Sequence, residues 1–121
     1  MPLNPTKILL IEDNPGDARL VQEELSDVMD FFFDLTIAGM LSTGIEHIES
    51  NKTDLILLDL TLPDSTGIDT FLKIFDKARN TPIIVLSGLK DETLAEVAIS
   101  KGANDYLVKG EIDSNILIKT I

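Results

Sequence analysis

The sequence predicts an α/β protein with a doubly wound, five-stranded parallel sheet. Two observations support this prediction: short apolar runs alternate along the chain with segments of helical periodicity, and the apolar runs carry few charges. Strands that are buried on both faces of a parallel sheet have this near-continuous hydrophobic pattern. Five β units in strict alternation with five α units favour the strand order 2-1-3-4-5, with right-handed crossovers and helices on both faces.

Five segments are predicted to form the strands. They read KILLIED at 7–13, FDLTIA at 33–38, DLILLD at 54–59, PIIVLS at 82–87 and DYLVK at 105–109. The second alternates apolar and polar residues, whereas the others are mostly apolar before a polar end. The three phenylalanines at 31–33 are expected to form the core-facing entry to the second strand rather than an exposed patch.

The segments between the strands have the spacing of amphipathic helices. Apolar residues recur three, four and seven positions apart, which places them on one face of a helix. The four sets are Ala18, Val21 and Leu25; Leu41, Gly44, Ile45 and Ile48; Ile68, Phe71, Leu72 and Phe75; and, more weakly, Leu94, Val97 and Ala98 before Lys101.

The ends of these helices carry recognisable signals. Asn14 and Pro15 are expected to open the first helix, Asp91 to cap the fourth, and Gly102 to end it. His47 falls on the outer side of the second helix, so it is expected at the surface. The pattern of residues 113–121 predicts a fifth helix that stops early. Its shortness suggests a trimmed chain or a junction with a further domain.

Length and composition exclude several functional classes. The chain has 121 residues, and 10 Lys+Arg against 21 Asp+Glu give a net charge of −11. Cysteine is absent and His47 is the only histidine, which excludes thiolate zinc sites, cysteine nucleophiles and a Ser-His-Asp triad. The acidity argues against direct nucleic-acid binding. With no long apolar run and no signal or transit peptide, residues 1–121 are expected to form one soluble, cytoplasmic domain without a membrane contact.

Polar residues stand at the ends of four predicted strands. They are Glu12 and Asp13, Asp59, Ser87 and Lys109. In an open parallel sheet, the carboxyl ends of the strands meet at one edge, where ligands bind. Each residue alone has an ordinary interpretation as a cap, turn or surface residue. Their combination at four strand ends instead predicts a site.

The charges of that site favour a bound cation. Two carboxylates about 4 Å apart repel by roughly 4 kcal/mol at an effective dielectric near 20. Glu12, Asp13 and Asp59 would therefore raise a carboxyl pKa or recruit a cation. Oxygen ligands without histidine or cysteine favour Mg²⁺, with Mn²⁺ or Ca²⁺ as alternatives. A carboxylate in such a site can also act as a nucleophile and form an aspartyl phosphate.

Four segments resemble the receiver domain of two-component response regulators. They are KILLIEDNP, LILLDLTLPDSTGID, PIIVLSG and GANDYLVKG, and the resemblance extends from Lys7 to about Ile121. It is close to the single-domain form found in the chemotaxis regulator. The resemblance implies a flavodoxin-like (βα)5 fold for the single receiver domain at 1–121.

The resemblance also implies roles for individual residues. Asp59 would accept a phosphoryl group, Asp13 would bind Mg²⁺ directly, and Glu12 would do so mainly through water. Asp59 and the backbone carbonyl of Thr61 would complete the protein's metal ligands. The remaining residues with implied roles are Lys109 and Ser87, which would hold phosphate oxygens, Tyr106, which would follow Ser87 as a switch, and Pro63 and Gly67, which would shape the loop after Asp59.

The implied function is that of a signalling phosphoacceptor rather than an enzyme acting on other molecules. The phosphoryl donor would be a histidine kinase or phosphotransfer protein. Phosphorylation would switch the face formed by the fourth helix, the fifth strand and the fifth helix. A downstream protein target or an attached output domain would read that face, and the same face would serve a phosphorylation-dependent dimer. The domain would catalyse only its own phosphorylation and slow dephosphorylation.

Three positions depart from the pattern of the family. Gly110 follows Lys109 where proline in a cis peptide is usual, so the bond before Gly110 is expected to be either trans or cis under strain. Ser87 replaces the commoner threonine, and Glu12 replaces the commoner aspartate. The hydroxyl and the carboxylate are kept at these positions, so the chemistry is retained.

Three other interpretations are compatible with parts of the pattern. A receiver that is never phosphorylated would keep the fold as an interaction module. A phosphohydrolase with an aspartate nucleophile would typically have a second acid two residues later, where this chain has Thr61. A flavin-binding protein of similar fold would have a phosphate-binding Ser/Thr-Gly loop after the first strand, where this chain has Glu12 and Asp13.

Overall fold

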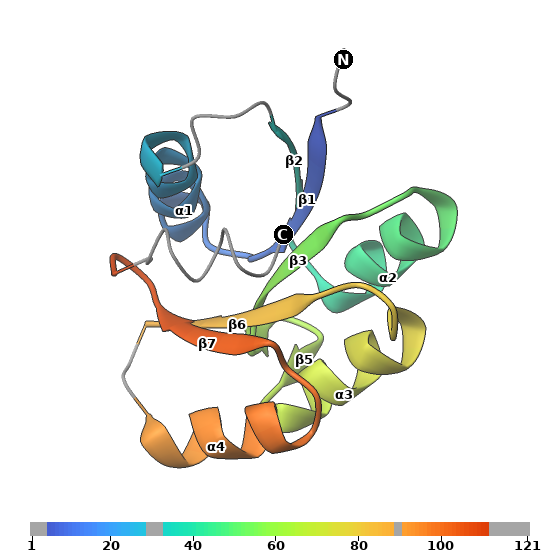
Figure 1. Cartoon of the computed structure of the whole chain (residues 1–121), viewed down its shortest axis with the longest axis vertical. Helices are drawn as coiled ribbons and strands as arrows, with labels where there is room; N and C mark the ends of the chain where they lie inside the picture. The colour runs from blue at the N-terminus through green and yellow to red at the C-terminus, as the bar shows by residue number, and fades with distance from the viewer. Residues whose placement is uncertain (1–4, 29–32, 89–90, 112–121) are drawn as a thin grey trace.

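The computed structural model describes residues 5–28, 33–88 and 91–111. Its main sheet contains five parallel strands in the order β2-β1-β3-β6-β7 (Figure 1). This arrangement confirms the predicted fold class and the predicted order of the five main strands. Their bounds are Thr6–Ile11 for β1, Phe33–Ala38 for β2, Leu55–Asp59 for β3, Ile83–Ser87 for β6 and Asp105–Val108 for β7.

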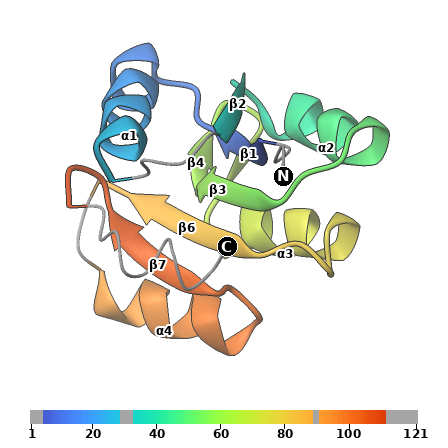
Figure 2. The ribbon, with the colours of Figure 1, turned by 45° about the horizontal axis from the view of Figure 1, so that its top comes forward.

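Helices cover both faces of this sheet (Figures 1 and 2). Helix α1 (Pro15–Val28) packs on one face, and α2 (Leu41–Ser50), α3 (Ile68–Lys77) and α4 (Glu92–Ser100) pack on the other. The fifth helix predicted at 113–121 lies outside the described residues. Within the described part of the chain, no helix is both long and apolar enough to cross a membrane.

The alternation of side chains along each strand divides the core into two clusters. In β1, Ile8 and Leu10 belong to the cluster under α1, whereas Leu9 and Ile11 face α2 and α3. All five residues of β3 are buried, because helices cover this central strand on both faces. Phe33 is half-buried against the α1 side, as expected, while residues 31 and 32 lie outside the described residues.

The predicted helix boundaries are confirmed by their capping contacts. The side chain of Asn14 accepts a hydrogen bond from the Asp17 N–H at 2.9 Å, and Asp91 accepts one from the Leu94 N–H at 3.0 Å. Gly102 follows the end of α4 with a φ of +122°, a conformation that glycine adopts without a steric penalty.

The loop after β3 contains structure that the sequence did not predict. Two short strands, β4 (Thr61–Leu62) and β5 (Ser65–Thr66), pair as an antiparallel hairpin. The first main strand is also shorter than predicted, since β1 ends at Ile11 and leaves Glu12 and Asp13 just beyond it. The acids therefore lie in the turn into α1, at the carboxyl edge of the sheet.

Candidate functional site

Three carboxylates meet at the carboxyl edge of β1 and β3. One ligand oxygen from each of Glu12, Asp13 and Asp59 lies within 4.8 Å of the others. They come together because β1 and β3 are parallel neighbours, so that their last residues end side by side. Glu12 and Asp59 are only 2% and 8% exposed, whereas Asp13 faces solvent. The predicted acidic cluster therefore exists, and two of its members are buried.

Lys109 supplies a positive charge to this cluster. Its ammonium nitrogen Nζ contacts Glu12 Oε1 and lies 3.0 Å from Asp59 Oδ2 and 3.0 Å from Asp17 Oδ2. Burial acts to lower the pKa of Lys109, but its hydrogen bonds to the three carboxylates outweigh this effect. The pKa of Lys109 is therefore raised above its ordinary value, and the side chain stays charged.

Glu12 is the acid whose ionisation is most perturbed. Burial raises the pKa of Glu12 to about 7, and the neighbouring carboxylate of Asp59 acts in the same direction. The hydrogen bonds from Lys109 and from the Asn14 N–H oppose this rise without cancelling it. Glu12 therefore changes its charge near neutral pH, which is the range in which a cation can displace its proton.

Of the remaining predicted site residues, Ser87 and Thr61 lie at the acidic cluster, whereas Tyr106 lies outside it. Ser87 ends β6, and both Ser87 and Thr61 line a cavity of about 340 Å³ together with the three acids and Lys109. The Thr61 N–H donates to Asp59 Oδ1 at 3.0 Å, which orients the Asp59 carboxylate. Tyr106 lies on β7 and is half-buried against the cluster that includes Ala98 of α4, outside this cavity.

The hairpin after Asp59 is fixed to α2 by a contact that the sequence did not predict. Asp64 accepts hydrogen bonds from the N–H groups of Leu41 at 2.8 Å and Ser42 at 3.0 Å. Its carboxylate thereby caps the first turn of α2, where Met40 makes no side-chain cap. These bonds lower the pKa of Asp64. Pro63 lies in the turn of this hairpin, and Gly67 closes it by donating to the Leu60 carbonyl at 2.8 Å.

Two acids of α1 also reach the site without having been predicted. Asp17 contacts Lys109, as described above, and Glu24 Oε1 accepts a hydrogen bond from the Gly110 N–H at 3.1 Å. The bond between Lys109 and Gly110 is trans, since none of the described peptide bonds is cis. The spacing of seven places Asp17 and Glu24 on one helix face, but nothing in the sequence indicates that this face meets Lys109 and Gly110.

The donor set fits a hard divalent cation. Three carboxylates supply oxygen atoms, and the described site contains neither histidine nor cysteine. Mg²⁺, Mn²⁺ and Ca²⁺ prefer such ligands, and the buried, repelling acids provide the electrostatic reason to bind one. Glu12, Asp13 and Asp59 are the side chains that would hold it.

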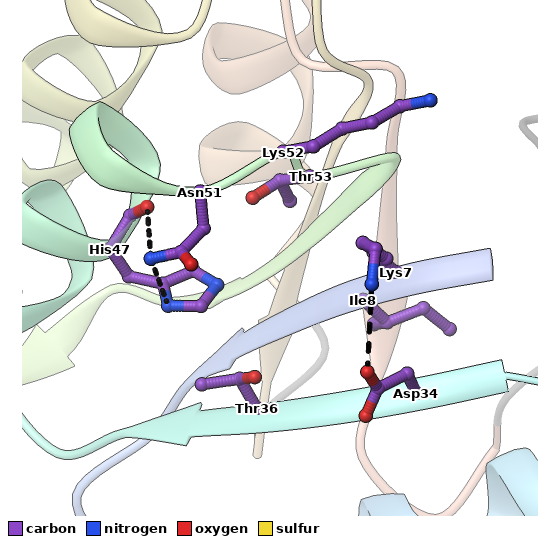
Figure 3. A pocket seen from close by; sticks show the side chains of 8 residues that line it. All are labelled: Lys7, Ile8, Asp34, Thr36, His47, Asn51, Lys52 and Thr53. Atoms are coloured by element: carbon purple, nitrogen blue, oxygen red, sulfur yellow. Dashed lines mark hydrogen bonds and ion pairs between the residues drawn. The ribbon is translucent and has the colours of Figure 1, made fainter. Parts of the chain in front are cut away.

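A second cavity lies at the opposite ends of the strands (Figure 3). It has a volume of about 160 Å³, and the half-buried ring of His47 lines it, so His47 is less exposed than expected. Figure 3 shows His47 beside Asn51, and Lys7 paired with Asp34 at 3.7 Å across β1 and β2. Thr53 also lines this cavity, and its hydroxyl is buried without a hydrogen-bond partner among the described residues.

Comparison with known families identifies the domain. Residues 8–121 match the family model described as the response regulator receiver domain. The chain belongs to this family. Receiver domains are signalling phosphoacceptors of two-component systems rather than classical enzymes, which agrees with the acids and the lysine at the carboxyl edge. The resemblance seen in the sequence is therefore confirmed.

Several full-length regulators contain a similar receiver. The chain is 33% identical over 120 residues to the nitrate/nitrite response regulator protein NarL of Escherichia coli K12, covering 97% of this chain and 53% of that protein. It is 39% identical over 105 residues to the response regulator ArlR of Staphylococcus saprophyticus, covering 86% of this chain and 46% of that protein. The chain thus spans about half the length of these relatives.

Solved receiver structures have the same fold. The receiver domain of the Francisella response regulator 1452 superposes with a TM-score of 0.76 at 29% identity, covering 97% of this chain and 93% of that chain. A response regulator from Burkholderia pseudomallei, described with a phosphorylated aspartic acid, a calcium ion and citrate, gives a TM-score of 0.76 at 22% identity. This match covers 95% of this receiver and 65% of that chain. At this lower identity the likeness shows the fold alone.

Proposed function

We propose that Asp59 accepts a phosphoryl group from the phosphohistidine of a histidine kinase or phosphotransfer protein, in a Mg²⁺-dependent reaction in the cytoplasm. A single observation carries this proposal: the carboxylate of Asp59 lies 3.0 Å from the charged Lys109 and clusters with two further acids, Glu12 and Asp13. A phosphoacceptor requires a nucleophilic oxygen and compensating positive charge at the same place. Both are available at the carboxyl edge of this sheet.

The proposed transfer is a nucleophilic substitution at phosphorus. A carboxylate oxygen of Asp59 forms a bond to phosphorus, and the phosphorus–nitrogen bond of the phosphohistidine breaks. The imidazole nitrogen leaves with the electron pair of that bond, and Asp59 becomes an acyl phosphate. A bound Mg²⁺ would neutralise charge on the transferring group. Hydrolysis of the acyl phosphate by water then restores Asp59 and releases inorganic phosphate.

The residues of this chain have separate tasks in the proposed reaction. Lys109 pairs with a phosphoryl oxygen, because its pKa is raised and it stays charged beside Asp59. The Thr61 N–H orients Asp59. The Thr61 carbonyl would join the acids as a ligand of a bound metal ion. Ser87, at the end of the neighbouring strand β6, donates its hydroxyl to a phosphoryl oxygen.

The proposed output is a change on the face that contains α4 and β7. Ser87 would move toward the phosphoryl group, and Tyr106 would follow into the space beside α4, which is a shift between two pre-existing states. The fifth helix that the sequence predicts for this face lies outside the described residues. A downstream protein, an attached output domain or a second phosphorylated copy would read the face.

The phosphoacceptor is tested by the intact mass of the protein after incubation with acetyl phosphate and Mg²⁺. The wild type and Asp76→Asn, which changes an exposed aspartate of α3, should each gain one phosphoryl group. Asp59→Asn should gain none, and a chelator should block the reaction. No adduct on the wild type, combined with no binding of beryllofluoride, would identify a receiver that is not phosphorylated.

The switch can be followed independently by fluorescence. Tyr106 is the only tyrosine and the chain has no tryptophan, so tyrosine emission reports on this position alone. Beryllofluoride with Mg²⁺ should change this emission in the wild type and not in Ser87→Ala. An equal change in both proteins would separate Tyr106 from the Ser87 hydroxyl and contradict the switch.

A further inference from the structure

Helix α1 contacts the end of β7 through two acidic side chains. Asp17 Oδ2 lies 3.0 Å from Lys109 Nζ, and Glu24 Oε1 lies 3.1 Å from the Gly110 nitrogen. The two acids are seven positions apart in α1, so they occupy one face of the helix. That face holds both the side chain of Lys109 and the backbone of the next residue.

The contact to Glu24 depends on the identity of residue 110. Gly110 has a φ of +88°, which disfavours a residue with a side chain, and its N–H is the donor to Glu24. Proline has no N–H and has its φ fixed near −65°, so it can provide neither feature. At this corner, the direction of Lys109 is therefore set by contacts to α1 rather than by a constrained ring.

Asp17 differs from the other two partners of Lys109. Glu12 and Asp59 belong to the cluster that could hold a metal ion, and Asp17 does not. A cation on that cluster competes with Lys109 for Glu12 and Asp59. Asp17 then remains as the carboxylate that keeps the ammonium at the site. It lies in the first turn of α1, where the helix dipole stabilises its negative charge.

We infer that Asp17 and Glu24 are positioning residues, through which α1 holds the Lys109–Gly110 corner so that the ammonium stays beside Asp59 when a cation occupies the acids. This inference rests on the proposed phosphoacceptor function of Asp59 and on the proposed pairing of Lys109 with the phosphoryl group. Asp17 and Glu24 act through Lys109, and neither is given a contact to the phosphoryl group.

The first test is spectroscopic and uses the metal-free protein. The side-chain ¹³C signal of the Lys109 Cε group is assigned by its loss in Lys109→Arg. This signal should shift in Asp17→Asn and in Glu24→Ala. It should stay in place in Glu23→Gln, a control that removes the same charge from α1 at a residue that forms an ion pair with the exposed Arg19. An unmoved signal in both test variants would overturn the inference.

The second test separates metal binding from phosphorylation. Relative to Glu23→Gln, Asp17→Asn should bind Mg²⁺ with unchanged affinity but react with acetyl phosphate about tenfold more slowly, because its lysine is misplaced. Glu24→Ala should also be slowed. Glu24→Gln should recover most of the rate, since an amide oxygen still accepts the hydrogen bond from Gly110.

The outcomes distinguish this inference from the proposed function. A wild type that is not phosphorylated would refute the phosphoacceptor, while the Lys109 signal would still report on the contacts with α1. Faster phosphorylation of Asp17→Asn would show that Asp17 competes with the phosphoryl group for Lys109. Equal loss in Glu24→Gln and Glu24→Ala would contradict the role of the hydrogen bond to Gly110.

Discussion

Replacing Lys109 by methionine removes the cation from the acidic cluster while keeping a side chain of similar length. Glu12 and Asp59 then face each other without compensation, and their side chains are only 1% and 11% exposed. The oxygens of the cluster lie within 4.8 Å of one another, a separation at which two charges repel by about 3.5 kcal/mol at a dielectric near 20. Removing one partner from a buried charge pair costs about 3–5 kcal/mol in measured cases.

We therefore expect Lys109→Met to lower the free energy of unfolding by about 3 kcal/mol in metal-free buffer at pH 8. The value is at the lower end because Glu12, whose pKa is already about 7, can bind a proton and relieve part of the repulsion. Mg²⁺ should restore much of this loss, since a ligand at 100 times its dissociation constant stabilises the folded state by about 2.7 kcal/mol.

Urea denaturation with and without Mg²⁺ measures both effects, with Lys73→Met as the control at an exposed position of α3. Mg²⁺ should stabilise Lys109→Met more than the wild type, because the lysine no longer competes for the acids. If Lys109→Met were as stable as Lys73→Met in metal-free buffer, the acids would not need the ammonium, and the electrostatic reasoning would be wrong.

Three further predictions follow from single contacts. In Glu12→Gln, the free energy of unfolding should depend less on pH than in the wild type. The pKa of Glu12 is about 7 in the folded wild type, above the ordinary 4.5, so the folded state binds this proton more tightly than the unfolded state does. As the pH rises from 5 to 8, the metal-free wild type should therefore lose about 2–3 kcal/mol more of its free energy of unfolding than the variant loses. Gly102→Ala should cost about 2 kcal/mol, because φ is +122° and the added Cβ would lie 2.7 Å from Phe75 Cε1. Asp64→Ala should lower the urea midpoint and speed amide exchange at Leu41, since it removes the cap of α2. The pKa of Asp64 is lowered, so its contribution is present above its unfolded pKa and lost as pH falls through the folded value.

Matched variants separate these predictions from general effects. Glu96→Gln, at an exposed position of α4, should keep the pH dependence of the wild type, and an equal flattening there would contradict the assignment to Glu12. Gly39→Ala places its Cβ in open space and should be nearly neutral, so a loss equal to that of Gly102→Ala would refute the steric argument. Asp76→Ala should leave exchange at Leu41 unchanged.

The three central strands, β1, β3 and β6, were predictable because most of their side chains are buried on both faces of the sheet. The prediction at 54–59 differs from β3 (Leu55–Asp59) by one residue, and the one at 82–87 differs from β6 (Ile83–Ser87) by one. Burial on both faces requires a continuous apolar run, which is a local and visible pattern. The same burial places the first polar residue of each run at the carboxyl edge, so Asp59 and Ser87 could be located from the sequence.

The contacts that complete the site were not predictable from local patterns. Asp17 and Glu24 of α1 read as ordinary exposed acids, and only the packing of α1 against the end of β7 shows that they hold Lys109 and Gly110. Asp64 reads as a turn residue, yet it caps a helix that begins 23 positions earlier in the chain. Such contacts depend on the distance between elements in space, and the sequence spacing carries no record of it.

The order of the strands has a consequence for how the protein folds. Lys109 joins the site from β7, 50 residues after Asp59 and 92 residues after Asp17. Contacts between such distant parts of a chain form late, because closing the loop between them costs entropy before any contact compensates for it. While the chain is being synthesised, the acids at the ends of β1 and β3 can therefore meet before their ammonium partner has emerged. A divalent cation is the partner that can neutralise them during that interval, so metal ions should ease the assembly of the sheet as well as the chemistry at its edge.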